Sequence, residues 1–175
     1  MLSHISDKSA KEQAFNAMLL RNKALIWHVC SDYSLDKVWN IEDCMQEVIV
    51  SLWRYFDTFE GRSSERTWVY RVATNTMLML RRKDNRSPAT ESIDNLDGIK
   101  NISSEKNDDN YQQLLQLINE LPEENGVIIR AYLDGFSYHE IAEMTDLKEG
   151  TIAMRISRIK QHLKEMFEKE NLKID

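Results

Sequence analysis

The sequence predicts an all-α fold in which two small helical domains are joined by a flexible linker and the C-terminal domain contains a helix-turn-helix. Three observations predict this fold class. Apolar residues recur three and four positions apart along most of the chain, which is the spacing that places side chains on one face of a helix. The period is absent from residues 87–110, where Ser, Asn and Asp are frequent, as in linkers. Near the C-terminus, two short periodic segments flank a tight turn.

Length and composition limit the class of protein. With 175 residues, the chain can form one domain of common size or two small ones. Its two cysteines, Cys30 and Cys44, are too few for a disulfide framework, so we expect reduced thiols in a cytoplasmic protein. No run approaches the roughly 20 apolar residues of a membrane span, and we expect no membrane insertion. His28 and Cys30 have no second pair at ligand spacing, so neither a metal nor a cofactor is expected.

Charge is unevenly distributed along the chain. The net charge is −6, from 29 acidic and 23 basic residues. Residues 61–86 form a local cation, with six arginines and Lys83 against Glu65 and Asp84. Residues 87–110 form a local anion directly after it. The acidic total therefore conceals a segment suited to a polyanionic partner.

Two helices are expected in about the first sixty residues. The first covers about residues 9–29. The second begins after Asn40, whose side chain suits an N-cap and is followed by acidic residues in the first turn. Its apolar positions repeat at three and four and make it strongly amphipathic: Met45, Val48, Ile49, Leu52, Trp53 and Phe56.

A third helix is expected from Trp68 to Lys83. Gly61 interrupts the preceding period, and Ser63 or Ser64 offers the N-cap. One set of its residues should face inward: Trp68, Val72, Ala73, Thr76, Met79 and Leu80. Arg71, Asn75 and Arg82 line a different face because they are spaced four and seven apart.

After the linker, residues 111–120 form another helix with a Leu- and Ile-rich face. Pro122 suits the first turn of the next helix, which should end near Asp134 with Gly135 as the left-handed residue. Gly126 lies inside this helix, where glycine is less favourable than alanine by about 1 kcal/mol.

The segment "SYHEIAEMTDLKEGTIAMRISR", residues 137–158, predicts the helix-turn-helix. Ser137 and Glu140 form a capping box, and Asp146 tolerates the left-handed conformation of the turn better than most residues. The second helix begins near residues 149–151 and turns its isoleucines inward. The pattern fits a helix that enters a DNA major groove. A helical hairpin that binds nothing stays open as an alternative, because the spacing specifies packing and not contact.

Two segments carry a family resemblance. They are "IEDCMQEVIVSLWRYFDTFEGRSSERTWVYRVATNTMLMLRRK" (41–83) and "LPEENGVIIRAYLDGFSYHEIAEMTDLKEGTIAMRISRIKQHLKE" (121–165). Together they resemble domains 2 and 4 of bacterial RNA polymerase sigma factors, most closely the small extracytoplasmic-function (ECF) group. The resemblance implies sigma domain 2 at 1–86, a linker at 87–110 and sigma domain 4 at 111–175.

The resemblance also implies functional residues in the first domain. A surface away from the apolar stripe of the second helix would dock the clamp coiled coil of the polymerase: Asp43, Gln46, Glu47 and Arg54. The loop and the third helix would capture the melted minus-ten element, with phosphates at the cations and a flipped base in a pocket. This set is Gly61, Arg62, Ser63, Arg71, Asn75, Arg81 and Arg82. Trp68 belongs to the core by its position on the apolar stripe, and the role of Tyr70 stays open.

In the second domain, the resemblance places the recognition helix in the major groove of the minus-thirty-five element. Ala153, Met154, Ser157 and Arg158 would approach base edges, while Thr151, Arg155 and Lys160 would reach phosphates. The chain departs from many relatives at two positions. Ala153 stands where they have a basic residue, and Asp146 stands where they have Gly.

The expected function is that of an alternative sigma factor responding to stress or another signal, which binds core RNA polymerase and directs promoter recognition and DNA melting. It is not expected to be an enzyme, because the nucleotide chemistry belongs to the polymerase. Partners would be core polymerase, promoter DNA and an anti-sigma factor. The acidic linker would either run toward the RNA exit path or serve only as a spacer. Two alternatives are a stand-alone helix-turn-helix repressor and a sigma-like interaction module that no longer binds DNA.

Overall fold

The computed structural model describes residues 2–34, 39–86 and 107–171, which form helices and no strand. The helices are α1 (Leu2–Ser34), α2 (Ile41–Tyr55), α3 (Glu65–Arg86), α4 (Asn107–Asn119), α5 (Glu123–Leu133), α6 (Tyr138–Thr145) and α7 (Glu149–Asn171), with a 3₁₀ turn, η1, at Phe56–Thr58. This confirms the all-α fold class. The expected linker lies outside the described residues as far as residue 106, and α4 begins at the next position.

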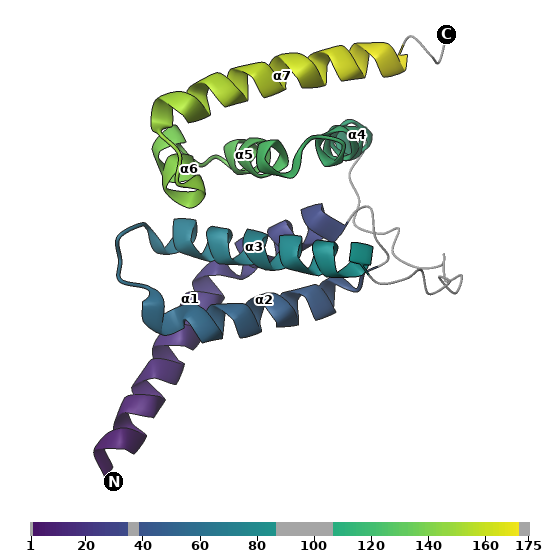
Figure 1. Ribbon diagram of the computed structural model, residues 1–175. Coiled ribbons are helices and arrows are strands. Elements are labelled where there is room, and N and C mark those ends of the chain that lie inside the picture. Colours follow the sequence, from purple (N-terminus) through teal and green to yellow (C-terminus); the bar gives the residue numbers. More distant parts are fainter. Residues whose placement is uncertain (1, 35–38, 87–106, 172–175) are drawn as a thin grey trace.

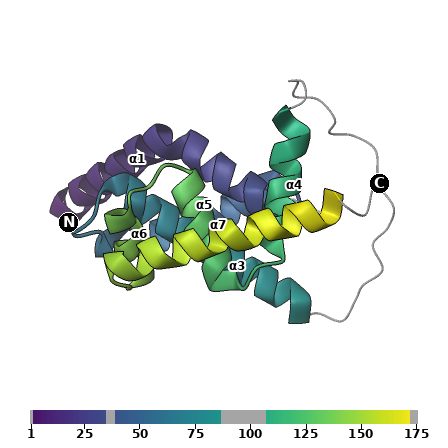
Figure 2. The same cartoon turned by 90° about the horizontal axis from the view of Figure 1, so that it is seen from above.

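The helices form two units stacked on each other (Figure 1). Helices α1–α3, here called the N-terminal unit, contact one another, and helices α4–α7, the C-terminal unit, do the same. Helices α3 and α6 join the two units. From above, α7 crosses over the other helices of its unit (Figure 2). Within the described residues, no helix has the length and apolarity needed to cross a membrane.

An aromatic cluster packs in the N-terminal unit, and side chains cap the N-termini of two of its helices. The ring of Phe15 on α1 meets those of Trp53 and Phe56 edge-on, with centroids 4.9 and 5.3 Å away. Asn40 caps α2 by accepting a hydrogen bond from the Glu42 N–H at 2.8 Å. Ser64 caps α3 by accepting one from the Thr67 N–H at 3.0 Å. Of the two serines offered by the sequence, Ser64 is therefore the cap.

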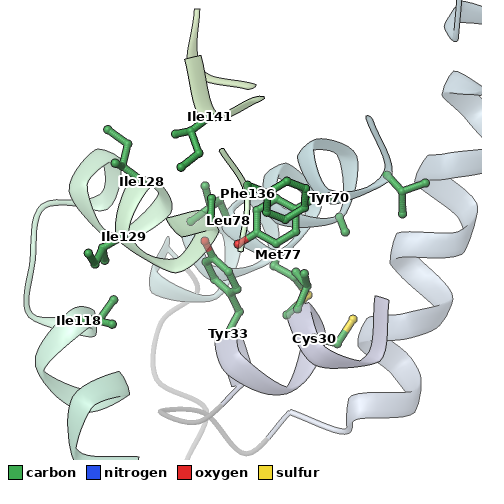
Figure 3. Packing of buried hydrophobic residues seen from close by; sticks show 14 of the residues in the cluster. Cys30, Tyr33, Tyr70, Met77, Leu78, Ile118, Ile128, Ile129, Phe136 and Ile141 are labelled. Carbon is green, nitrogen blue, oxygen red and sulfur yellow. The ribbon is translucent and has the colours of Figure 1, made fainter. Parts of the chain in front are cut away.

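Helix α3 is buried on two sides, which the sequence pattern did not predict. Besides its expected inward residues, it buries Val69, Tyr70, Thr74, Met77 and Leu78. The second buried side faces the C-terminal unit, where the ring of Tyr70 lies 4.5 Å from that of Phe136 (Figure 3). A single apolar stripe accounts for packing against one neighbour only. The expectation for Met79 was wrong, because its side chain is 65% exposed.

The two cysteines are free and buried, as reduced core thiols would be. Burial raises the pKa of the Cys30 thiol to about 12, and it also raises that of Cys44. Cys30 is completely buried on α1, while His28, two residues earlier, is only half-buried. The two side chains that suggested a metal pair in the sequence therefore lie in different environments.

The C-terminal unit contains the predicted helix ends. Gly135 adopts φ +80° after α5, and the Phe136 N–H then donates to the Ala131 carbonyl at 3.1 Å. This turn directs Phe136 into the core (Figure 3). At the start of α6, both hydrogen bonds of the predicted capping box are present between Ser137 and Glu140.

The turn between α6 and α7 depends on a non-glycine residue in the left-handed region. Asp146 has φ 56° and ψ 34°, and the Leu147 N–H donates to the Ala142 carbonyl at 3.2 Å. Such a turn favours glycine, because a Cβ at positive φ crowds the following carbonyl. The conformation expected for Asp146 from the sequence is confirmed.

Replacing Asp146 with Gly should therefore raise the free energy of unfolding by about 0.5–1 kcal/mol, because the left-handed backbone no longer opposes a Cβ. Denaturant unfolding of the full chain measures the change. Glu143→Gly, an exposed substitution inside α6, is the matched control and should lower stability by about 1 kcal/mol. Loss of stability in both variants would contradict the argument.

Candidate nucleic-acid interface

The predicted polymerase-docking residues share an exposed side of α2. Asp43, Gln46, Glu47 and Arg54 are all exposed. Asp43 and Glu47 line a cavity of about 350 Å³ together with Lys83 from α3. Arg54 lies about two turns further along and lines a different cavity. All four side chains are thus available to a protein partner, and Arg54 also borders the cavity of Arg71 and Asn75.

The loop before α3 encloses the first of two cavities next to the predicted minus-ten residues. Gly61 allows the loop to turn with φ +70°, and Arg62 pairs with Glu60 at 2.5 Å in solvent. The cavity measures about 390 Å³ and is lined by Arg62, Ser63 and Arg71. Helix α6 of the C-terminal unit supplies Glu143 and Met144 to the same lining. A polyanion approaching this loop would meet a carboxylate from the other unit.

The second cavity, of about 410 Å³, brings together Arg71, Asn75 and Arg82. Their spacing of four and seven residues places them on one exposed stripe of α3. Tyr55 and Met79 also line this cavity and are exposed, although the sequence analysis did not select them as site residues. In the sequence, Tyr55 is marked only by its position outside the apolar stripe of α2. Met79 is predicted to face the core.

Arg81 is separated from the other predicted minus-ten residues. It lies one residue before Arg82 and so points about 100° away from it around the helix. It donates to the side-chain oxygen of Asn119 at 3.3 Å and lines a cavity of about 200 Å³ between the units, with the buried Arg130. Arg81 therefore contacts the C-terminal unit in this structure. Arg82 lines this small cavity as well as the second large one, and Arg62, Ser63, Arg71 and Asn75 line only the two larger cavities.

The predicted minus-thirty-five residues lie along the first half of α7. Met154, Ser157, Arg158 and Lys160 are exposed, while Thr151, Ala153 and Arg155 are half-buried. Met154 is a large apolar residue with 58% of its surface exposed, on the side of α7 opposite the buried isoleucines.

Two cations of this set contact side chains of α5. Arg155 pairs with Glu124 at 3.0 Å, and the ammonium of Lys160 lies 5.4 Å from the centroid of the Tyr132 ring. Arg155 and Lys160 are thereby held at the flanks of α7. Arg158 and Arg155 both line a cavity of about 460 Å³, together with His162 and Asn125.

Polar contacts fasten the two units together. Arg66 donates to the Asp134 carbonyl at 2.8 Å, and its guanidinium lies 4.0 Å from the centroid of the Phe136 ring. Thr67 donates to Glu140 at 3.1 Å. Arg82 forms an ion pair with Glu123, so that a predicted phosphate contact is engaged by a carboxylate of the other unit.

A half-buried imidazole lies among carboxylates at the same junction. His28 Nε2 is 2.7 Å from Asp134 and 3.6 Å from Asp32. The hydrogen bond with Asp134 raises the pKa of His28. Burial raises the pKa of Asp32, and the nearby His28 opposes that shift. The hydroxyl of Tyr111 donates to Asp32 at 3.2 Å.

Comparison with known proteins identifies the class. The family model described as Sigma-70 region 2 matches residues 18–87, and that described as Sigma-70, region 4 matches residues 111–163. The two matches cover most of the chain: the first falls on the N-terminal unit and the second on the C-terminal unit. The chain belongs to the sigma-70 family of bacterial RNA polymerase sigma factors.

Curated relatives narrow the class to one group. The ECF RNA polymerase sigma-E factor of Escherichia coli (strain K12) is 29% identical over 163 residues, a match that covers 86% of this chain and 84% of that protein. The protein of the same name from Haemophilus influenzae is 28% identical, with 86% and 85% covered. The chain is accordingly an alternative sigma factor of the ECF group.

Solved structures share the fold. The sigma factor RpoE in complex with the anti-sigma factor NepR from Bartonella quintana superposes with a TM-score of 0.65 at 23% identity, covering 89% of this chain and 98% of that chain. CnrH, in complex with the cytosolic domain of CnrY, gives a TM-score of 0.64 at 17% identity and 90% coverage of both chains.

Proposed function

We propose that this sigma factor binds core RNA polymerase, places its two helical units on the two promoter elements, and stabilises melted minus-ten DNA. In this division, residues 1–86 act as sigma domain 2 and residues 111–175 as sigma domain 4. The observation that carries the proposal is the stripe formed by Arg71, Asn75 and Arg82. These side chains meet an exposed tyrosine at one cavity, which combines cations for phosphates with polar and aromatic groups for a base.

The proposed polymerase contact is the exposed acidic side of α2. Asp43, Gln46 and Glu47 are exposed there, and each of the three is free of the N-terminal unit's core. Carboxylates suit a protein partner better than they suit DNA, because they repel phosphates. We therefore assign this surface to the polymerase, and Arg54 to the border between polymerase and DNA.

The proposed minus-ten contact begins at the loop and continues along α3. Arg62 and Arg71 would hold the backbone of the single strand, and Asn75 would hydrogen-bond to the edge of a flipped base. Tyr55 joins this set because it offers a ring face next to Arg71 and Asn75. Trp68 is excluded as a stacking platform, since its ring is buried and packs on Phe59 at 5.2 Å.

The proposed minus-thirty-five contact is the exposed side of α7. Arg158 can form a bidentate contact to guanine, and Met154 can pack on a thymine methyl group. Ala153 offers only a methyl group, half-buried, where many relatives carry a cation. Sequence choice at this element therefore depends on Arg158, Met154 and Ser157. Arg155 and Lys160 would hold phosphates after leaving their partners on α5.

Division of the binding among partners resolves the conflict between a net charge of −6 and a DNA partner. The polymerase would supply much of the affinity, the cations of α3 would hold the melted strand, and α7 would select the sequence. Catalysis would stay with the polymerase, and the site of action would be the cytoplasm. Both solved relatives described above are complexes with another protein, an anti-sigma factor in one of them. We propose that an anti-sigma factor also regulates this chain.

Run-off transcription tests the function. Purified core polymerase, a promoter library and the full chain should give transcripts that depend on the chain. Without polymerase, the chain should bind duplex DNA weakly. Tight binding to a duplex operator without polymerase would favour a stand-alone repressor. Polymerase binding without any promoter-specific transcript would favour an interaction module, and failure to bind polymerase would refute the sigma mechanism.

Asn75→Ala should slow open-complex formation by up to roughly tenfold, because one hydrogen bond to the flipped base contributes about 0.5–1.5 kcal/mol. Binding to closed duplex promoter should change little. Asn16→Ala, which removes an exposed asparagine of α1 outside all the proposed surfaces, is the control. Permanganate reactivity of melted thymines measures opening. An equal loss in both steps would argue against a base pocket at Asn75.

Arg158→Ala should lose about 1–3 kcal/mol of binding at one promoter position and accept other bases there. Lys160→Ala is the matched comparison and should weaken all sequences alike, as loss of a phosphate contact does. Selection from a randomised minus-thirty-five element measures both variants. A uniform loss for Arg158→Ala would reassign this residue to the DNA backbone.

Glu123→Gln should increase affinity for promoter DNA by roughly twofold, because Arg82 no longer has to leave a carboxylate before it binds phosphate. Glu168→Gln removes the same charge from an α7 pair with Lys164 and controls for net charge. The difference between the two variants should vanish in an Arg82→Ala background. Salt-dependent binding of the polymerase holoenzyme is the measurement, and equal effects of both glutamates would contradict the competition.

A further inference from the structure

The junction of the two units contains a three-residue cluster with the composition of a metal site. His28 and Asp32 stand four residues apart on α1, so both side chains project from the same face of the helix. Asp134 comes from the end of α5, 106 positions after His28. The three potential ligand atoms all lie within 4.8 Å of one another. The spacing of His28 and Asp32 is visible in the sequence, but only the fold brings Asp134 beside them.

The separations suit coordination of one ion. Ligands about 2.0–2.2 Å from a tetrahedral metal ion are about 3.3 Å apart. The measured separations of 2.7 Å, from His28 Nε2 to Asp134, and 3.6 Å, to Asp32, lie on either side of that value. Small rotations of the two carboxylates would equalise them.

The surroundings resemble those of an open metal site. The side chains of Asp32 and Asp134 are only 8% and 9% exposed, while that of His28 is 38% exposed and offers a route to solvent. Tyr111, on α4, donates its hydroxyl to Asp32 and would orient that carboxylate from outside the coordination sphere. Such outer hydrogen bonds are regular features of metal centres. Three protein ligands with solvent access leave room for a bound water.

The charge of the buried groups also favours a cation. Asp32 and Asp134 contribute two negative charges, and the buried guanidinium of Arg130 contributes one positive charge while it stacks 4.6 Å from the Tyr33 ring centroid. A protonated His28 would balance these charges without a metal, whereas a metal-binding, neutral imidazole leaves one negative charge for the ion to compensate. A buried uncompensated charge is unfavourable unless it is paired or coordinates a metal.

We propose that His28, Asp32 and Asp134 bind one divalent transition-metal ion, of the Zn²⁺ or Co²⁺ class, and that this ion fastens the N-terminal unit to the C-terminal unit. One imidazole and two carboxylates suit these ions better than Ca²⁺ or Mg²⁺, which prefer six or more oxygen ligands. The ligands belong to α1 and α5, so the ion stabilises the packed arrangement of the units and no arrangement that separates them.

The consequence for transcription rests on the proposed function. In the packed arrangement, Arg82 is paired with Glu123, and α6 borders the loop cavity next to Arg62. An ion that favours this arrangement would oppose the spreading of the units over two promoter elements. Metal would thus lower the share of chains ready to join polymerase, by mass action.

The test is a Co²⁺ titration of the untagged full-length chain, followed by visible absorption and by calorimetry. We expect one ion per chain and a spectrum of tetrahedral or five-coordinate Co²⁺. His28→Gln should weaken binding by more than about 100-fold. Tyr111→Phe should weaken it by roughly tenfold, as loss of an outer hydrogen bond does. His139→Gln is the matched control, because His139 lies 3.8–3.9 Å from Glu143 and Glu149 on the exposed surface of the C-terminal unit.

Equal Co²⁺ binding by the His28→Gln chain and the parent, or a loss of binding in His139→Gln instead, would overturn the proposal. Absence of any stoichiometric binding would also overturn it and leave a protonated His28 as the bridge between the carboxylates. Thermal unfolding provides a second readout: Zn²⁺ should raise the midpoint of the parent chain and leave that of His28→Gln unchanged. These measurements use no polymerase, so their failure is separate from failure of the sigma mechanism.

Discussion

The packing of α3 against both units is the constraint on which the rest of the structure depends. One side of this helix closes the core of α1 and α2, and Tyr70 on the other side packs on Phe136. A helix buried on two sides has only a narrow stripe left for solvent, and here that stripe contains Arg71, Asn75 and Arg82. The residues with the clearest DNA-binding chemistry therefore lie on the stripe that helix packing leaves exposed, where Arg82 is paired with Glu123 of the other unit. Their geometry is rigid because the helix that presents them is held from both sides.

Burial and charge play different parts in holding the units together. The exposed ion pairs of Arg82 and Arg155 contribute little to stability in water, since solvent screens them and the side chains lose freedom. Apolar contacts such as Tyr70 with Phe136 contribute more, in proportion to the area removed from water. The same weak pairs matter for binding, because each one must open before its arginine reaches a phosphate. Apolar packing thus holds the two units together, and the ion pairs affect how readily the arginines can bind DNA phosphates.

The cluster of His28, Asp32 and Asp134 makes the packing of the two units depend on how the two carboxylates are neutralised. Buried carboxylates are unfavourable in an apolar junction unless a proton, a cation or hydrogen bonds compensate them. A junction made only of apolar side chains would contain no group that binds a proton or a metal ion. With these three groups present, the association of the units depends on what neutralises them. Under the proposed function, in which the two units separate on promoter DNA, such dependence would regulate activity.

The helices, their caps and the family could be predicted from the sequence alone. The 3.6-residue period located the helices, and side-chain caps at Asn40 and Ser137 act on neighbouring backbone groups, so local chemistry was sufficient. The left-handed Asp146 was likewise a local matter. The site was predictable to the extent that spacing decides which face a side chain occupies, as for Arg71, Asn75 and Arg82. The biological roles of these residues came from the resemblance and stay proposals.

The contact between the two units could not be predicted from the sequence and is visible only in the folded chain. That contact buried the second side of α3, turned Arg81 toward Asn119 and placed Asp134 beside His28. Each of these outcomes depends on residues far apart in the chain, and a periodic pattern contains no information about which partner covers a face. A single helix can be read from its own residues, because its hydrogen bonds are local. The junction between two units is the result of three-dimensional packing, and it is there that the unexpected chemistry of this protein lies.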